Sequence, residues 1–427
     1  LAKAGQWTPK LEERYKLLGI TEPFEPQAFP VRLWDVFGQA GHPVRATVEG
    51  MGSLLLSRLL DLNETQSGIL AIVFKVAQEK DWPLIDLKDL QSLLKEVYEH
   101  SSDYSAQYGN ITKQSVGAIQ RSLLVLEEEG ADQFFGEPAL DLNDFMQLDA
   151  SGRGYINILS ATKLFHSPKL YSTFLIWMLS RLFETLPEVG DPEKPKLVFF
   201  FDEAHLLFKD ASKLFLEKVE QVVRLIRSKG VGIYFITQNP QDLPESVLAQ
   251  LGNRVQHALR AYTPKEMKAI KVAAQSFRPN PDFDTETVIT ELGTGEALVS
   301  FLNEKGQPSV VERAYILSPQ SSFDLLNESE QLALITTSPF HQKYATTIDR
   351  ESAYEKLAAK ASKEAQEEEQ KEAAKERAAA EKAEQKRSPG RPRKSSLEKA
   401  KDSFLSSLFR TIAREIAKLI MGSFKRK

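Results

Sequence analysis

The 427-residue sequence contains no cysteine. Disulfides, cysteine-based zinc sites and thiol catalysis are therefore excluded, and the absence is compatible with a reducing compartment. The six histidines are scattered along the chain, without the regular spacing that metal ligands show. These absences favour a cytoplasmic protein whose chemistry depends on oxygen and amide side chains.

The glycine-rich loop that most often binds phosphates, GxxxxGK[ST], is also missing. Its backbone N–H groups cradle the phosphates while its lysine neutralises them. None of the 22 glycines is followed by lysine. The sequence opens on Leu1, in a segment, LAKAGQWTPK, that reads like the interior of a longer protein. We therefore expect any such loop to lie before residue 1.

What the sequence has is enough apolar material for a sizeable core. At 427 residues, 42% of them hydrophobic, the chain can hold two to three domains of ordinary size. Its net charge is only -4, but residues 386–427 hold 13 Lys and Arg against three acids, a balance of +10 that leaves -14 for residues 1–385. A basic tail on an acidic body favours a polyanionic partner for the tail.

The segment KLVFFFDEAH, residues 196–205, joins an apolar run to two adjacent carboxylates. The run from Val198 to Phe201 is typical of a strand buried on both faces of a parallel sheet, which places Asp202 and Glu203 at its carboxyl end. Ligands bind at that edge of open α/β sheets. Asp202 is therefore a candidate Mg²⁺ partner, and Glu203 a candidate base for an attacking water. Alternatively, the acids only cap the following helix.

A second set of polar side chains follows the next predicted strand. IYFITQNP ends in Thr237, Gln238 and Asn239, which we expect at the same sheet edge. Gln238 is a candidate to contact the γ-phosphate or the lytic water, and Thr237 is a candidate nucleotide contact. The alternative is a plain turn from strand to loop.

Two arginines and one histidine complete the candidates. Arg254 lies at the start of a fourth predicted strand, so we expect it at the same edge, where it would stabilise a transferred phosphoryl group across a subunit boundary. Arg260 is a second candidate for this role. An ordinary surface ion pair remains the alternative for both. His205 is expected to couple or pack rather than act as a base, because Glu203 already fills that role.

The order of apolar segments predicts the architecture. Strands alternate with helices of 10 to 20 residues from GYINILS to RVQHALRAY, which is typical of right-handed βαβ units in a mainly parallel sheet. The segment GEALVSFLNEKGQPSVVERAYI predicts an antiparallel hairpin that turns at Lys305 and Gly306 and caps this sheet. The predicted divisions are an N-terminal part of the core at 1–80, a helical insertion at 81–150, the remaining core at 151–345, a charged helix at 346–387, and a basic linker with an amphipathic helix at 388–427.

The C-terminal tail combines two weak binding signals. SPGRPRKSS resembles the short core of segments that lay Arg into the minor groove of A·T-rich DNA, although a flexible basic linker is the simpler interpretation. The helix predicted from Ser403 to Phe424 has one apolar face and an opposite face of Arg and Lys. DNA, an anionic membrane surface and docking on the body of the protein all remain open for it.

Several long motifs in one order resemble a bacterial family of HerA-like ATPases, which includes proteins labelled by the domain of unknown function DUF853 or by a helicase HerA-like C-terminal domain. The motifs are LVFFFDEAHLLF, RLIRSKGVGIYFITQNPQDLPESVLAQLGNRVQHALRAYTPKE, ELGTGEALVSFLNEKGQPSVVER, VRLWDVFGQAGHPVRATVEGMGSLLLSRLLDLNETQSGIL and YGNITKQSVGAIQRSLL. The resemblance covers residues 1 to about 355.

This resemblance implies a RecA-like P-loop NTPase fold of the HerA/FtsK type, ATP and Mg²⁺ as cofactors, a ring hexamer, and movement of DNA. By matching motifs, it gives Asp202 and Glu203 the Walker B roles, Gln238 the sensor role, and Arg254 the role of an arginine acting in trans. The family's Walker A loop should precede Leu1. A non-catalytic nucleic-acid-binding or scaffold protein with a degenerate NTPase fold is the alternative, although the joint presence of Asp202, Glu203 and Gln238 favours a motor.

Overall fold

The computed structural model of the chain describes residues 1–385, except for 165, 166, 191 and 209–212. The chain divides into two compact units, residues 1–358 and 359–427. The linker and amphipathic helix predicted at 388–427 lie outside the described residues. Across the described ranges, no helix is both long and apolar enough to cross a membrane.

The N-terminal segment forms helix α1 (Pro9–Leu18), with Thr8 as its N-cap and Gly19 as its C-cap. Arg14 on this helix donates hydrogen bonds to three backbone carbonyls, those of Thr294, Gly295 and Ile316. These bonds join the first residues of the chain to a hairpin almost 300 residues later. No pattern in the sequence indicates this contact.

The first sheet is parallel and has three strands. Strand β1 (Val31–Asp35) lies at the centre, with β2 (His42–Pro43) on one side and β3 (Ile156–Ser160) on the other. The strand predicted at GYINILS is β3, but it pairs with β1 rather than with the strand that precedes Asp202. The Nε1 of Trp34 donates to Asn157 Oδ1 at 2.9 Å and supports this register.

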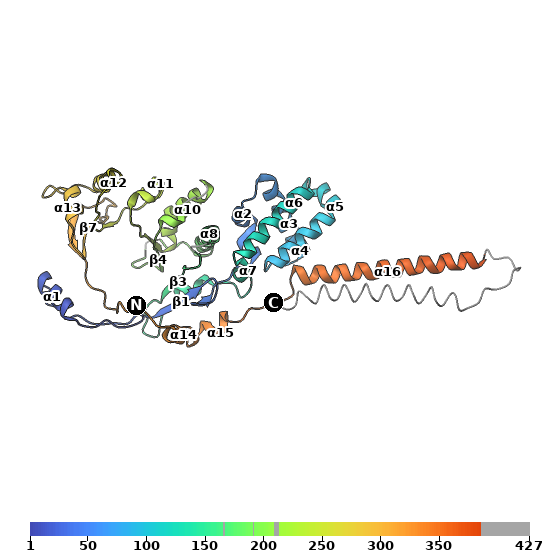
Figure 1. Cartoon of the computed structure of the whole chain (residues 1–427), viewed down its shortest axis with the longest axis horizontal. Coiled ribbons are helices and arrows are strands. Elements are labelled where there is room, and N and C mark those ends of the chain that lie inside the picture. The colour runs from blue at the N-terminus through green and yellow to red at the C-terminus, as the bar shows by residue number, and fades with distance from the viewer. Residues whose placement is uncertain (165–166, 191, 209–212, 386–427) are drawn as a thin grey trace. The chain divides into compact units, whose positions relative to one another are not determined.

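Six helices connect the strands of this sheet and are gathered together in Figure 1. They are α2 (Val48–Leu59), α3 (Glu64–Lys80), α4 (Leu87–Glu99), α5 (Ser101–Tyr108), α6 (Lys113–Glu128) and α7 (Ala131–Phe134). Asn63 forms a capping box with Gln66 at the start of α3, which separates this helix from α2. Helices α3, α4 and α6 pack on one another and contribute to the main core.

The second sheet carries the predicted acidic strand. The elements in chain order are α8 (Pro168–Thr185), β4 (Leu197–Phe201), α9 (His205–Phe208), α10 (Lys213–Leu225) and β5 (Val231–Phe235). Strands β4 and β5 are parallel and pair from Leu197 with Val231 to Phe201 with Phe235. The predicted α/β class is therefore confirmed, and parallel strands joined by helices fit a RecA-like core.

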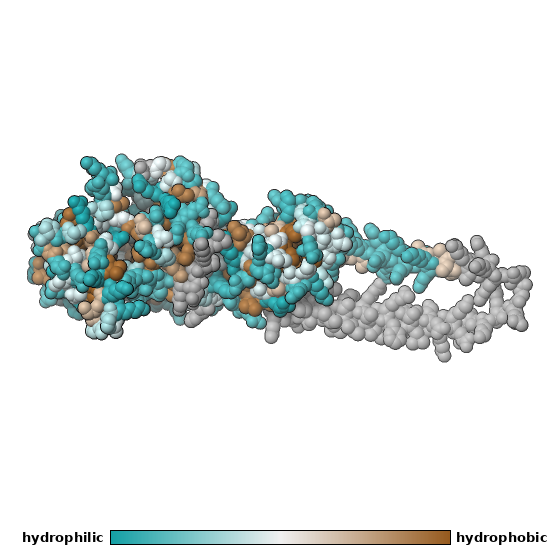
Figure 2. Space-filling view, turned by 90° about the horizontal axis from the view of Figure 1, so that it is seen from above, coloured by the Kyte–Doolittle hydropathy of each residue, from teal (hydrophilic) through white to brown (hydrophobic). Residues whose placement is uncertain are grey.

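One face of this second sheet is exposed, contrary to the predicted burial on both faces. Phe201 is 5% exposed in the main core, whereas Phe200 and Tyr234 on the opposite face are 64% and 55% exposed. Their rings stack with centroids 4.6 Å apart. Figure 2 likewise shows apolar residues at the surface, as brown areas among hydrophilic ones. Parallel sheets are normally covered on both faces, and in the part of the chain that the structure describes the face of Phe200 and Tyr234 has no such cover.

The predicted fourth parallel strand is wrong. Only Arg254–Gln256 forms a strand, β6, and it pairs antiparallel with β7 (Glu296–Ser300), which pairs in turn with β8 (Glu312–Tyr315). The predicted hairpin with its turn at Gly306 is confirmed, but it builds this separate sheet instead of capping the parallel one. The helices that pack against this sheet are α12 (Pro264–Gln275) and α13 (Thr285–Glu291), whereas α11 (Glu245–Leu248) packs on α10. A small second core beneath α12 and α13 explains why this region folds apart.

Two short helices return the chain to the first sheet: α14 (Glu328–Thr336) and α15 (Phe340–Tyr344). Phe340 and Tyr344 pack their rings against Trp34 of β1. The same aromatic cluster encloses His42, which is 1% exposed and has no hydrogen-bond partner for either ring nitrogen among the described residues. Burial lowers the pKa of His42 to about 4, with smaller contributions from His341 and Arg32.

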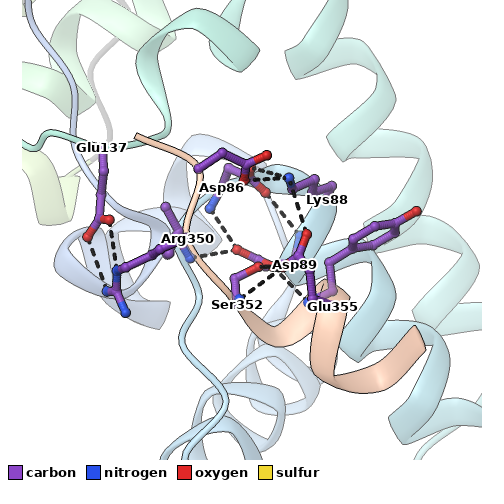
Figure 3. Close-up of polar contacts among 10 residues, drawn as sticks. Asp86, Lys88, Asp89, Glu137, Arg350, Ser352 and Glu355 are labelled. Carbon is purple, nitrogen blue, oxygen red and sulfur yellow. Dashed lines mark hydrogen bonds and ion pairs between the residues drawn. The ribbon is translucent and has the colours of Figure 1, made fainter. Parts of the chain in front are cut away.

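The long charged helix α16 (Ala353–Gln385) begins at a dense polar cluster, which Figure 3 shows. We call residues 349–356 together with their partners on α4 the latch. At its centre, the Asp89 carboxylate accepts from the Ser352 hydroxyl and from the backbone N–H of Tyr354. Around it, Lys88 pairs with Asp349 at 3.1 Å. The latch fixes the first turn of the charged helix that the sequence predicts at 346–387.

Candidate functional site

The carboxyl ends of β4 and β5 bring the predicted site residues together. Backbone pairing continues past the strands, because the N–H of Ile236 donates to the Phe201 carbonyl at 2.9 Å and that of Ala204 to the Ile236 carbonyl at 2.8 Å. This extension places the turn after β4 beside the turn after β5. The prediction that the acids and Gln238 lie at one sheet edge is confirmed.

Glu203 lies at the centre of this edge. Its Oε1 accepts a hydrogen bond from Gln238 Nε2 at 2.9 Å. Its Oε2 lies 3.3 Å from His205 Nδ1, yet both atoms are shielded from solvent and have no hydrogen-bond partner among the described residues. The backbone of Glu203 has a φ of 49°, in the left-handed region that a residue with a side chain rarely adopts. Strain and unpaired polar atoms of this kind gather at functional sites.

Asp202 differs from its neighbour because its side chain faces solvent. One of its oxygens, Oδ1, accepts from the backbone N–H of Glu203 at 3.0 Å. Tyr171 of α8 lies close enough to feel its charge: burial, with a smaller contribution from Asp202, raises the pKa of this phenol to about 12. Tyr171 is a site neighbour that the sequence did not indicate, because it belongs to a helix about 30 residues upstream.

The donor set fits a magnesium ion held largely by water. No group of three or more His, Asp or Glu within the described ranges is arranged to hold a metal ion. Mg²⁺ commonly binds through one or two carboxylates and keeps several waters. The exposed carboxylate of Asp202, at the end of β4, meets that requirement. The Thr237 hydroxyl, at the end of β5, donates to the Asn239 carbonyl at 3.3 Å.

Neither candidate arginine lies at this edge. Arg254 belongs to the antiparallel sheet, where it donates to the Ser276 carbonyl at 3.0 Å, and burial lowers its pKa. Arg260 donates to the carbonyls of Thr290 and Leu292. The alternative of a surface ion pair is not seen for either residue in the described part of the chain, because both donate to backbone carbonyls. The prediction that Arg254 lies beside Asp202 at the edge of one sheet is therefore wrong. Its action on the site of a neighbouring subunit remains a prediction.

Comparisons with known proteins agree with the motifs. The family model described as helicase HerA-like C-terminal matches residues 1–427. The DNA double-strand break repair helicase HerA of Saccharolobus solfataricus is 25% identical over 211 residues, 49% of this chain and 40% of that protein. Its namesake from Sulfolobus acidocaldarius is 30% identical over 99 residues, 23% of this chain and 19% of that protein. The matches thus span less than half of either relative.

Among solved structures, the bacterial conjugative coupling protein TrwBdeltaN70 is similar to this chain. The two share 11% sequence identity with a TM-score of 0.46, over 74% of this chain and 83% of that one.

Proposed function

Since the chain belongs to the helicase HerA-like C-terminal family, we propose that it forms part of an ATP-hydrolysing motor that acts on DNA. The observation that carries this proposal is the bond from Gln238 Nε2 to Glu203 Oε1 at the carboxyl edge of β4 and β5. That bond unites a carboxylate and an amide where parallel sheets bind ligands. The two relatives described as DNA double-strand break repair helicases support DNA as the substrate.

Each residue of the site has a distinct proposed role. Asp202 would hold Mg²⁺ through water, and the ion would neutralise phosphate charge. Glu203 would take the proton from the attacking water, while Gln238 orients that water and senses the γ-phosphate. Thr237 would contact the nucleotide. Arg254 would reach the site of a neighbouring subunit, in a homo-oligomer that we propose to be a ring hexamer in the cytoplasm.

We further propose that the phosphate-binding loop is supplied from outside residues 1–427. Two observations support this division of the site. No glycine of the chain is followed by lysine, and the sheet that carries the acids is exposed on the face of Phe200 and Tyr234. ATP binding by these 427 residues alone should accordingly be weak, because the N–H cradle and the lysine would be absent.

The test is Glu203→Gln in the protein that includes its phosphate loop. ATP binding should remain nearly intact, while hydrolysis falls by about 100-fold or more because the proton acceptor is removed. Glu245→Gln, at an exposed position of α11, is the matched control and should hydrolyse ATP at the wild-type rate. Wild-type turnover in Glu203→Gln would refute the role of Glu203. Absence of hydrolysis in the wild type would favour a scaffold with a degenerate NTPase fold.

Binding of DNA by the basic tail has its own test. Removal of residues 386–427 should weaken DNA binding and reduce its salt dependence by about 0.9 log unit per tenfold salt for each phosphate that the tail neutralises. Equal affinity and equal salt dependence with and without these residues would contradict DNA binding by the tail. That result would leave the membrane surface or docking on the protein as the role of the tail.

A further inference from the structure

Among the histidines that the structure describes, His205 is the one whose ring lies beside a candidate catalytic group. It is the first residue of α9, and its Nδ1 lies 3.3 Å from Glu203 Oε2. Neither atom has a hydrogen-bond partner among the described residues, and both are shielded from solvent. The contact is close but out of line for a hydrogen bond, so a small rotation of either side chain would create one.

The two oxygens of Glu203 therefore have different surroundings. Oε2 is enclosed beside the imidazole, whereas Oε1 meets the amide of the exposed Gln238. The Glu203 side chain is 36% exposed although its Oε2 is shielded, so the rest of the side chain provides that exposure. Oε2 is therefore closed to water, which leaves Oε1 as the oxygen that a water would meet.

The left-handed backbone of Glu203 strengthens the case for a fixed orientation. At a φ of 49° the turn between β4 and α9 carries strain that the surrounding structure must hold. This turn sets Glu203 and His205 on the same side, two residues apart, whereas a helix of ordinary pitch would turn them to opposite sides. The strained backbone is explained if it brings the His205 imidazole and the Glu203 carboxylate together.

We propose that His205 is a positioning residue which, by holding Oε2, selects Oε1 of Glu203 as the oxygen that receives the proton from the attacking water. This inference rests on the proposed function. In the step it serves, the water oxygen bonds to the γ-phosphorus of ATP, and the bond from that phosphorus to the β–γ bridging oxygen breaks. ADP leaves with the bond electrons, and the water proton passes to Oε1.

The first experiment needs no turnover and uses the 427-residue chain itself. Imidazole nitrogen NMR spectra of the wild type and of Glu203→Gln are compared, with each histidine assigned by substitution. The His205 signals should move, because a carboxylate is replaced by an amide at its Nδ1. The signals of His257, whose Nδ1 lies 2.9 Å from the Glu296 carbonyl in the antiparallel sheet, should not. Unchanged His205 signals would overturn the inference.

The second experiment uses steady-state ATP hydrolysis by the protein that includes its phosphate loop. His205→Ala should lower kcat about tenfold and leave KM for ATP within about twofold, since ground-state binding does not involve this ring. His205→Asn should restore most of the rate, because the Asn amide nitrogen occupies the place of Nδ1. His205→Gln places its nitrogen near Nε2 instead and should not restore it. Equal rates for the Asn and Gln variants would contradict the inference.

A double-mutant cycle separates positioning from general structural damage. If His205 acts through Glu203, adding His205→Ala to Glu203→Gln should produce no further loss of rate. A further tenfold loss in that background would overturn the inference. Failure of the proposed function is distinguishable, because it would appear as absence of hydrolysis in the wild type while the NMR comparison still decides the contact.

Discussion

Asp89 and Glu203 are both carboxylates near the start of a helix, but their surroundings differ. Asp89 is fully buried and accepts four hydrogen bonds. Its donors are the backbone N–H groups of Ile85, Asp86 and Tyr354 and the hydroxyl of Ser352. Glu203 is partly exposed, accepts one side-chain hydrogen bond, and leaves its shielded oxygen without any among the described residues.

This difference in hydrogen bonding has different consequences for the region around Asp89 and the region around Glu203. A buried carboxylate that is saturated with donors favours one structure, because removal of any partner leaves a charge unpaired. A carboxylate with an unsatisfied oxygen and a strained backbone retains the capacity to bind something else. The latch thus fixes the first turn of α16, whereas the edge of β4 and β5 has a carboxylate oxygen with no hydrogen-bond partner among the described residues.

The largest effect should come from the latch, through Asp89→Ala. Four donors would be left without their acceptor inside the protein, so the free energy of unfolding should fall by about 3–5 kcal/mol. Urea denaturation followed by circular dichroism measures this decrease. Asp349→Ala is the matched control, because its side chain is 76% exposed and its ion pair with Lys88 should contribute less than about 1 kcal/mol. Equal decreases in the two variants would contradict a structural centre at Asp89.

Neighbouring phenylalanines in β4 test the exposed face of the site region. Phe201→Ala should lower the free energy of unfolding by about 3–4 kcal/mol, since this ring lies in the main core. Phe200→Ala should lower it by less than about 1 kcal/mol, because the ring is 64% exposed and contacts chiefly Tyr234. A decrease at Phe200 equal to that at Phe201 would show that another part of the protein covers this face in solution.

The sequence predicted the site edge better than the arrangement of sheets. An apolar run that ends in Asp202 and Glu203 is a local signal, and so is a strand that ends in Gln238; both came together as expected. Arg254 was misplaced because strand direction and sheet membership depend on distant partners. Its strand pairs with Glu296–Ser300, and a small separate core fixes that choice.

The hydrophobic pattern of the sequence could not predict contacts between residues that lie far apart in the chain. Asp89 and Ser352 lie 263 residues apart, and each looks locally like an ordinary helix cap. Tyr171 has no sequence signal that links it to Asp202. The orientation of Glu203 between Gln238 and His205 follows from the left-handed turn, and no glycine there announced a positive φ.

A smaller effect on stability, which depends on pH, is expected at His42. This residue is buried outside the candidate site, and its ring nitrogens have no hydrogen-bond partner among the described residues. Its pKa is about 4 when folded and about 6.5 when unfolded, so below pH 6.5 the unfolded chain binds more protons. The free energy of unfolding should therefore fall by up to about 3 kcal/mol as the pH drops from 6.5 to 4, and stay constant with respect to this group above 6.5.

The measurement for His42 is urea denaturation at pH 7 and pH 4.5 for the wild type and His42→Phe. Phenylalanine suits a site formed by Trp34 and Phe340, and it has no nitrogen to protonate. The variant should lose less stability on acidification than the wild type. His257→Phe, at an exposed position, is the control and should keep the wild-type pH dependence. Parallel pH curves for wild type and His42→Phe would contradict the argument.

The smallest effect on the free energy of unfolding is expected at Arg350, on the rim of the latch. Its guanidinium binds Glu137 through two hydrogen bonds, of 2.8 and 3.1 Å (Figure 3). The Arg350 side chain is 52% exposed, so solvent screens the pair, and Arg350→Ala should lower the free energy of unfolding by only about 0.5–1 kcal/mol. Most of this difference should vanish in roughly 1 M NaCl. A decrease as large as that of Asp89→Ala, or one insensitive to salt, would mean that the rim and the centre of the latch act as one buried unit.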